Sequence, residues 1–122
     1  GRPRRVGPID LVATRYGCRI QGATEVALTK LDVLSYMKEI PVCTQYEVNG
    51  EKTDDFPFTA VIDEAKPVLT TVPGWGCDIS GVRKYEDLPQ AARDYVEYVE
   101  KAIGVHISYV SVGAGRDEII YR

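Results

Sequence analysis

The sequence contains no apolar run near the ~20 residues of a membrane helix, which excludes a membrane-spanning segment. Cysteine is scarce: Cys18, Cys43 and Cys77 lie far apart and form no CxxC pair. This odd, dispersed count argues against a disulfide framework or a zinc site, and it favours reduced thiols in a cytoplasmic protein. The only histidine is His106, which excludes a multi-histidine metal site within the chain.

A net positive charge is also lacking outside the first five residues. The 122 residues carry a net charge of −3, and Arg2, Arg4 and Arg5 contribute +3, so the rest of the chain carries −6. A nucleic-acid-binding surface needs a broad basic face, so we expect no nucleic-acid partner. The length suits one domain, and 44% hydrophobic residues are enough to bury a core.

The N-terminus resembles neither a signal peptide nor a transit peptide, because no apolar segment follows the arginines. Gly1 is not an initiator methionine. We expect that the chain is cut from a longer protein.

Apolar periodicity predicts two main helices. The first spans Asp10–Gln21, with Asp10 as N-cap and Gly22 as the left-handed C-terminal residue. The second and stronger one spans Asp87–Ile103, with a capping box of Asp87 and Gln90 and an end at Gly104.

The clearest strand prediction is a hairpin. Residues of Ile40–Val48 alternate between apolar and polar, Asn49-Gly50 favours a type I′ turn, and Glu51–Phe56 would return antiparallel. The other predicted elements are a strand buried on both faces at Glu25–Thr29, strands at Val68–Val72, Val105–Val112 and Asp117–Arg122, and short helical segments at Val33–Met37 and Thr59–Lys66. Strands that alternate with helices indicate an α/β fold with mixed pairing.

The segment Thr29-Lys30-Leu31-Asp32 follows a predicted strand, where α/β sheets place ligands. The carboxylate of Asp32 could accept both the N1–H and the amine of guanine, and it would repel the bare N1 acceptor of adenine. Lys30 could lay its methylene stem over the base. The alternative is a solvated turn with an aspartate N-cap, which sequence statistics alone favour.

Two further segments could bind ligands. The small-residue loop Ser111–Arg116 could bring backbone N–H groups close to a base or phosphate, or it could be an ordinary turn. Arg2 and Arg4 would share one side of an extended segment and could bind carboxylates or phosphates, or the terminus could bind nothing. His106 and Trp75 are interpreted as structural residues.

The order of these blocks closely resembles the C-terminal part of the adenylosuccinate synthetase family. The resemblance covers nearly the whole chain, and it rests on the following blocks: Gly1-Arg2-Pro3-Arg4-Arg5-Val6-Gly7, Leu28-Thr29-Lys30-Leu31-Asp32-Val33-Leu34, Val72-Pro73-Gly74-Trp75, Leu88-Pro89, Gly104-Val105-His106-Ile107 and Ser111-Val112-Gly113. It implies an α/β fold that is the C-terminal part of a larger P-loop-NTPase-like mixed sheet, with flanking helices and one β-hairpin.

The resemblance also implies a function. The family joins IMP to L-aspartate with GTP and Mg²⁺, which gives adenylosuccinate, GDP and phosphate in AMP biosynthesis. The expected parent is a cytoplasmic homodimer that uses neither nucleic acid nor a membrane. The family's catalytic residues and phosphate loop precede the region that this chain matches, so the resemblance implies no catalytic residue or Mg²⁺ ligand here and no turnover by this chain alone.

Site residues follow from the matching motifs. The implied substrate-binding residues are Gly1, Arg2 and Arg4, in a substrate loop of which residues 1–7 are the remaining part. The implied guanine-recognition elements are residues 29–32 and 111–116. The implied GTP-binding residues are Arg4, Lys30, Leu31, Asp32, Ser111, Val112 and Gly113.

Two other hypotheses remain open at this level. One is a non-enzymatic α/β binding module with a basic N-terminal arm for RNA or an acidic partner, whose binding would depend strongly on salt. The other is a structural α/β domain without a site.

Overall fold

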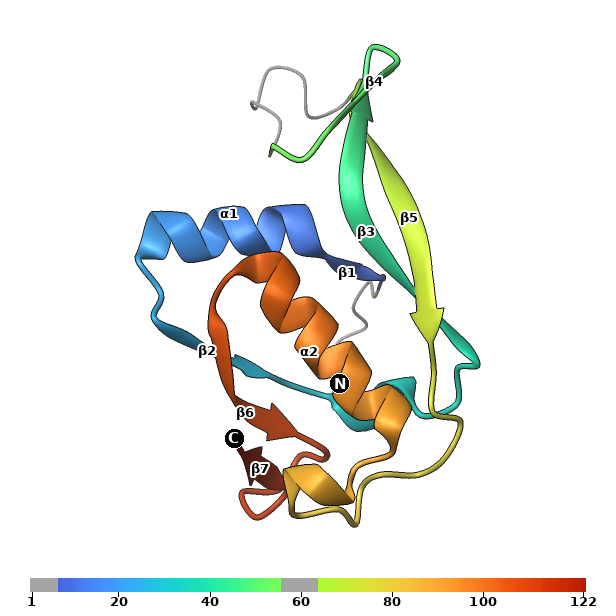
Figure 1. The fold of residues 1–122 in the computed structure, drawn as a ribbon, viewed down its shortest axis with the longest axis vertical. Helices are drawn as coiled ribbons and strands as arrows, with labels where there is room; N and C mark the ends of the chain where they lie inside the picture. The colour runs from blue at the N-terminus through green and yellow to red at the C-terminus, as the bar shows by residue number, and fades with distance from the viewer. Residues whose placement is uncertain (1–6, 56–63) are drawn as a thin grey trace, which may run out of the picture.

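The computed structural model describes residues 7–55 and 64–122, which form two small sheets and two α-helices (Figure 1). The α/β class predicted from the sequence is confirmed. The predicted elements at Glu51–Phe56 and Thr59–Lys66 lie partly outside the described residues. Within the described ranges, no helix is both long and apolar enough to cross a membrane.

The first sheet contains β1 (Ile9–Asp10), β3 (Glu39–Val48), β4 (Glu51–Thr53) and β5 (Lys66–Pro73). Strand β1 pairs with β3 in parallel, whereas β4 and β5 pair with β3 antiparallel. Figure 1 shows β3 and β5 running side by side away from the helices, with β4 at the far end. This sheet therefore ends in an antiparallel arm, which we call the β3–β5 ribbon.

The hairpin between β3 and β4 is confirmed. Asn49 and Gly50 have φ values of 54° and 82°, as a type I′ turn requires at both positions. The predicted alternation along β3 is interrupted, because the register with β5 shifts between Cys43 and Gln45. Val42 and Cys43 are consequently both buried, although they are neighbours in a strand.

The second sheet has the order β2 (Glu25–Leu28), β6 (His106–Ser111) and β7 (Ile119–Tyr121). Strands β2 and β6 are parallel, and β6 and β7 are antiparallel. The prediction that β2 is buried on both faces was wrong, because Glu25 and Ala27 are exposed. Among the described residues, helices and loops cover only the other face of this strand.

Helix α1 (Leu11–Gln21) begins and ends as predicted. The Asp10 carboxylate accepts a hydrogen bond from the Ala13 N–H at 2.9 Å, and Gly22 ends the helix with a φ of 65°.

Helix α2 (Gln90–Ile103) ends at Gly104 as predicted, with a φ of 73° for that glycine. Its predicted capping box was wrong. Pro89 is the N-cap, and Asp87 instead belongs to the preceding 3-10 turn η3 (Tyr85–Asp87). That turn is closed by a hydrogen bond from the Leu88 N–H to the Tyr85 carbonyl. The sequence pattern therefore predicted approximately where α2 begins, but it did not identify the N-cap residue.

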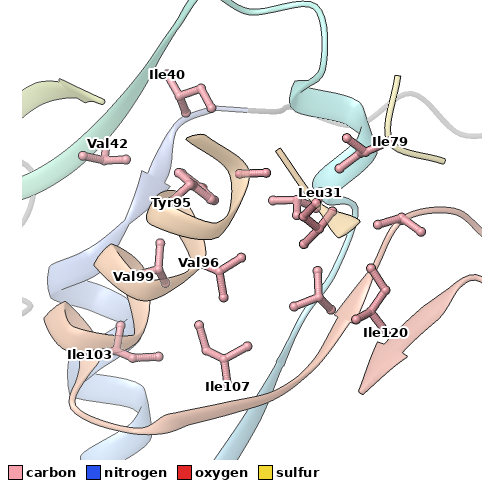
Figure 2. Packing of buried hydrophobic residues seen from close by; sticks show 14 of the residues in the cluster. Leu31, Ile40, Val42, Ile79, Tyr95, Val96, Val99, Ile103, Ile107 and Ile120 are labelled. Atoms are coloured by element: carbon pink, nitrogen blue, oxygen red, sulfur yellow. The ribbon is translucent and has the colours of Figure 1, made fainter. Parts of the chain in front are cut away.

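The main core gathers around the apolar face of α2 (Figure 2). Buried side chains of α2 form one cluster with residues of β3, β6, β7 and the 3-10 turn η1 (Leu31–Leu34). The labelled members in Figure 2 are Leu31, Ile40, Val42, Ile79, Tyr95, Val96, Val99, Ile103, Ile107 and Ile120. Each fully buried aliphatic side chain contributes about 1.5–3 kcal/mol relative to an exposed one. The cluster therefore joins both sheets and η1 to one helix.

A polar cluster joins the last residue to α2 and β6. The Arg122 guanidinium donates to Glu100 at 2.6 Å and to the Ile107 carbonyl at 2.9 Å, and it lies 4.7 Å from the centre of the Tyr85 ring. His106 lies 2.9 Å from the same Glu100 oxygen. The hydrogen bond from Arg122 is the main cause that lowers the pKa of Glu100 from its ordinary value.

Candidate functional site

The two predicted guanine elements meet at one edge of the second sheet. Leu28 at the end of β2 pairs with Val110 in β6, and the two strands are parallel. Their carboxyl ends therefore lie at the same edge, where segments 29–32 and 111–116 leave the sheet (Figure 1). In α/β sheets, ligands bind outside the carboxyl ends of strands. We call this edge the β2/β6 edge.

On the first side of the edge, one buried residue anchors η1 in the core. Leu31 is 1% exposed and belongs to the main core. Its neighbours face outward: Lys30 is exposed and Asp32 is half-buried. Within the described ranges, the Asp32 carboxylate forms no hydrogen bond, while its carbonyl accepts one from the Ser35 N–H at 3.1 Å. The backbone of Asp32 is thus held by this hydrogen bond and by the buried Leu31 beside it, while its carboxylate has no described hydrogen-bond partner.

Lys30 has a strained backbone. Its φ is 61°, and only Asn49, in the hairpin turn, shares a positive φ among the described non-glycine residues. This conformation costs a lysine about 1–2 kcal/mol. Strain of this kind concentrates at functional sites, where the surrounding structure maintains it. The conformation turns the chain sharply between β2 and the buried Leu31.

A buttress from the end of β5 supports η1. Trp75 donates its indole N–H to the Ser35 hydroxyl at 3.2 Å and packs edge-on against Tyr95, with ring centres 5.8 Å apart. The Gly74 N–H donates to the Lys38 carbonyl at 2.8 Å. A Cβ on Gly74 would overlap the Met37 carbonyl oxygen, so this close approach requires glycine. Trp75 is thus a packing residue, as predicted.

On the second side of the edge, the loop after β6 is compact. The Ser111 hydroxyl donates to the Gly113 carbonyl at 2.9 Å, and the intervening Val112 is fully buried. Ser111 and Gly113 are both half-buried. Val112 therefore anchors the loop in the core, in the same way that Leu31 anchors η1.

Gly1, Arg2 and Arg4 lie outside the described residues. Gly7, the first described residue, lines an apolar cavity of about 250 Å³ together with Val33 and Leu34 of η1. The described chain that follows the arginine segment therefore begins beside η1, the element that carries Asp32.

No group of three or more His, Cys, Asp or Glu side chains that could hold a metal occurs in residues 7–55 and 64–122. The sequence analysis did not single out Ser35 or Glu118, which contact the two sides of the edge. The Ser35 hydroxyl accepts from the Trp75 indole, forty residues away in the sequence, and the Glu118 carboxylate accepts from a backbone N–H of the loop. No residue pattern marks such bonds in advance.

The chain is an α/β protein with a parallel β2–β6 pair and a helix packed on one face of the sheet. In this class of fold, ligands bind at the carboxyl ends of the strands. A sequence model of the adenylosuccinate synthetase family matches residues 1–120, and the chain belongs to this family. The resemblance inferred from the sequence is therefore confirmed.

The similar proteins carry the same name. The chain is 49% identical over 123 residues to the adenylosuccinate synthetase of Mycolicibacterium smegmatis and 48% identical to that of Mycobacterium tuberculosis. Each alignment covers 100% of this chain and 28% of the relative. A solved structure of fully ligated adenylosuccinate synthetase from Plasmodium falciparum matches with a TM-score of 0.92 and 32% identity, over 99% of this chain and 30% of that one. The chain thus spans 28% of the length of these curated relatives.

Proposed function

We propose that this chain supplies the guanine-recognition part, and part of the substrate-binding segment, of a GTP-dependent ligase in purine biosynthesis. The reaction joins IMP to L-aspartate and yields adenylosuccinate, GDP and phosphate. The observation that carries this proposal is the convergence of Asp32 and the Ser111–Gly113 segment at the β2/β6 edge. Membership of the adenylosuccinate synthetase family supports it.

The first side of the edge suits guanine in particular. The Asp32 carboxylate is an acceptor-only group without a described hydrogen-bond partner, so it can accept the N1–H and the exocyclic amine together. Adenine would place an acceptor against it and would be rejected. Lys30 is exposed beside it and can cover the base with its methylene stem, while its ammonium group stays in water. Leu31 lies between Lys30 and Asp32 in the sequence and anchors this segment in the core.

The second side would contact the opposite edge of the base. The Ser111 hydroxyl donates to the Gly113 carbonyl, and the Val112 N–H donates to the Glu118 carbonyl. The neutral donor that this loop offers is therefore the Gly113 N–H, which has no hydrogen-bond partner among the described residues. Neutral donors suit the guanine O6 acceptor, whereas a second carboxylate facing the base would repel it. The edge therefore combines one charged acceptor with a neutral loop.

The remaining substrate contacts are assigned to the arginine segment. Gly1 and Arg2 would contact IMP and aspartate, and Arg4 would bind the aspartate carboxylate and approach the GTP phosphates, since guanidinium groups bind both kinds of anion bidentately. We place the Mg²⁺ ligands outside this chain and assign no step through the metal to its residues. We place the phosphate-binding and catalytic groups outside this chain, in a cytoplasmic homodimer.

The test uses a chimera in which this chain replaces the matching region of the Mycolicibacterium smegmatis synthetase. Asp32→Asn exchanges an acceptor for a donor, so kcat/KM for GTP should fall by about 10- to 100-fold, the equivalent of losing a charged hydrogen bond. The preference for GTP over ATP should shrink with it. Steady-state assays with IMP and L-aspartate measure both.

The matched control is Asp55→Asn, an exposed aspartate near the end of the described hairpin, which should leave kcat/KM unchanged. An unaltered nucleotide preference in Asp32→Asn would refute the guanine assignment. The 122-residue chain alone should show no turnover of IMP, aspartate and GTP, and appreciable turnover would contradict the placement of the catalytic groups elsewhere.

A further inference from the structure

The geometry points to Glu118 as a positioning residue that holds the Ser111–Gly115 loop in the shape that receives the base. This inference rests on the proposed guanine-binding function of the β2/β6 edge. It concerns a residue that precedes β7 by one position and that carries no recognition motif.

Glu118 closes the loop through three hydrogen bonds. Its carboxylate Oε1 accepts from the Gly115 N–H at 3.1 Å, and its own N–H donates to the Gly115 carbonyl at 3.1 Å. Its carbonyl accepts from the Val112 N–H at 2.9 Å. One residue thus contacts the loop at its buried anchor and at its far end. Two of these bonds use only backbone atoms, but the bond from the carboxylate depends on the side chain.

The side chain also fills the space that two glycines leave. A Cβ on Gly113 would overlap the Glu118 carboxylate, and a Cβ on Gly115 would lie 2.7 Å from Oε1. Neither glycine has a positive φ, so backbone conformation does not explain glycine at these positions. The reason is steric, because the carboxylate packs directly against the Cα atoms of the loop.

This packing fixes the loop from the side that the carboxylate occupies. The Ser111 hydroxyl bond to the Gly113 carbonyl ties the loop internally. Since Oε1 is engaged by the Gly115 N–H, Glu118 acts on the loop and not on the base. A positioning role requires only an oxygen acceptor within hydrogen-bond distance of the Gly115 N–H. A charge-dependent role would require the negative charge of the carboxylate.

The side-chain variants separate these roles in the chimera described above. Glu118→Gln keeps an oxygen acceptor at the same reach and should keep the KM for GTP within about twofold. Glu118→Ala removes the acceptor and should raise that KM by about tenfold, the upper range for one hydrogen bond. Glu118→Asp keeps the charge but shortens the reach by one methylene, so it should also raise the KM for GTP. The kcat and the KM for IMP should stay unchanged.

A double-mutant cycle tests the packing directly. Gly113→Ala should raise the KM for GTP in the wild-type background, because its methyl group displaces the carboxylate. In the Glu118→Ala background the space is empty, so the same change should have a further effect of less than about twofold. Coupling between the two positions would support the inference, and additive effects would overturn it.

The controls keep failure of this inference apart from failure of the proposed function. Glu51→Ala removes an exposed glutamate on β4 and should leave the KM for GTP unchanged. If Asp32→Asn weakens GTP use but Glu118→Ala and Glu118→Asp do not, Glu118 does not position the loop. A Glu118→Gln variant as defective as Glu118→Ala would also overturn the inference, because charge would then be required. If Asp32→Asn has no effect either, both proposals fail.

Discussion

The β2–β6–β7 sheet and the β3–β5 ribbon are both joined by backbone hydrogen bonds between strands, but they differ in what covers them. In the sheet, Ile107, Val110 and Ile120 are fully buried beneath α2 and η1. In the ribbon, six of the eight residues of β5 are exposed, and Leu69 is 51% exposed. Hydrogen bonds alone make a regular strand, but side-chain packing decides whether that strand is held against the rest of the molecule.

The candidate site lies on the packed side of this contrast. Its two anchors, Leu31 and Val112, belong to the same core as Ile107. Binding groups are held more accurately on packed elements than on exposed ones, because neighbouring side chains restrict their rotamers. The packed sheet therefore supports the proposed site on both sides, whereas the ribbon contributes through Gly74 and Trp75, which directly follow β5.

The largest expected effect contrasts one side chain from each region. Ile107→Ala removes a fully buried side chain from β6 and should lower the free energy of unfolding by about 4 kcal/mol. Leu69→Ala removes a half-exposed side chain from β5 and should cost less than about 1 kcal/mol. Urea denaturation of the chain measures both. Similar losses at the two positions would break the comparison.

A smaller effect is expected where the ribbon supports the site. Gly74→Ala would force a methyl group into the Met37 carbonyl, so the backbone must shift at a cost of about 2 kcal/mol. In the chimera it should also weaken GTP use, because Ser35 and η1 rest on this segment.

The matched control for Gly74→Ala is Gly81→Ala, where a Cβ meets nothing within 4 Å and the φ is not positive. That variant should change stability by less than about 0.5 kcal/mol. Equal effects of the two glycine variants would show that the close approach at Gly74 is unimportant.

The smallest effect depends on pH and concerns the polar cluster behind the packed sheet. The hydrogen bond from Arg122 holds the pKa of Glu100 below its ordinary value of about 4.3. A lowered pKa in the folded chain adds stability above that ordinary value, and this stability is lost as the pH falls through the folded pKa. Glu100→Gln should therefore cost about 1 kcal/mol at pH 7 and progressively less below pH 4.3.

Urea denaturation between pH 7 and pH 3 measures this dependence. Glu51→Gln, at an exposed glutamate of β4, serves as the control and should follow the wild type throughout. A constant difference between Glu100→Gln and the wild type across this range would contradict the proposed linkage.

Local sequence signals predicted several boundaries correctly. Asp10 and Gly22 bound α1, and Asn49-Gly50 forms the hairpin turn, because a cap or a turn depends on a few neighbouring residues. The predicted capping box of α2 was wrong because neighbouring residues can also form another local structure. Asp87 was recruited by a 3-10 turn, which competes with the helix for the same residues.

Burial was harder to predict than pairing. The apolar run in β2 was expected to be covered on both faces, yet Glu25 and Ala27 are exposed. Burial depends on which elements pack against a strand, and a run of apolar residues does not indicate which elements these are. The shift after Cys43 likewise arises from the pairing of β3 with β5, so alternation within β3 alone could not reveal it.

By itself, the sequence determined the family, the α/β class and the residue types that suit guanine, because motifs and periodicity are local properties of the chain. Only the tertiary structure decided that Asp32 and Gly113 meet at one edge, since the parallel pairing of β2 with β6 joins segments about eighty residues apart. The structure alone also revealed the contacts of Glu118 with the loop and the Ser35 hydroxyl as the partner of Trp75, a residue that the sequence had already indicated as structural. Glu118 contacts backbone atoms of the loop, and Trp75 contacts side chains that are distant in the sequence. Both sets of contacts exist only once the chain has folded.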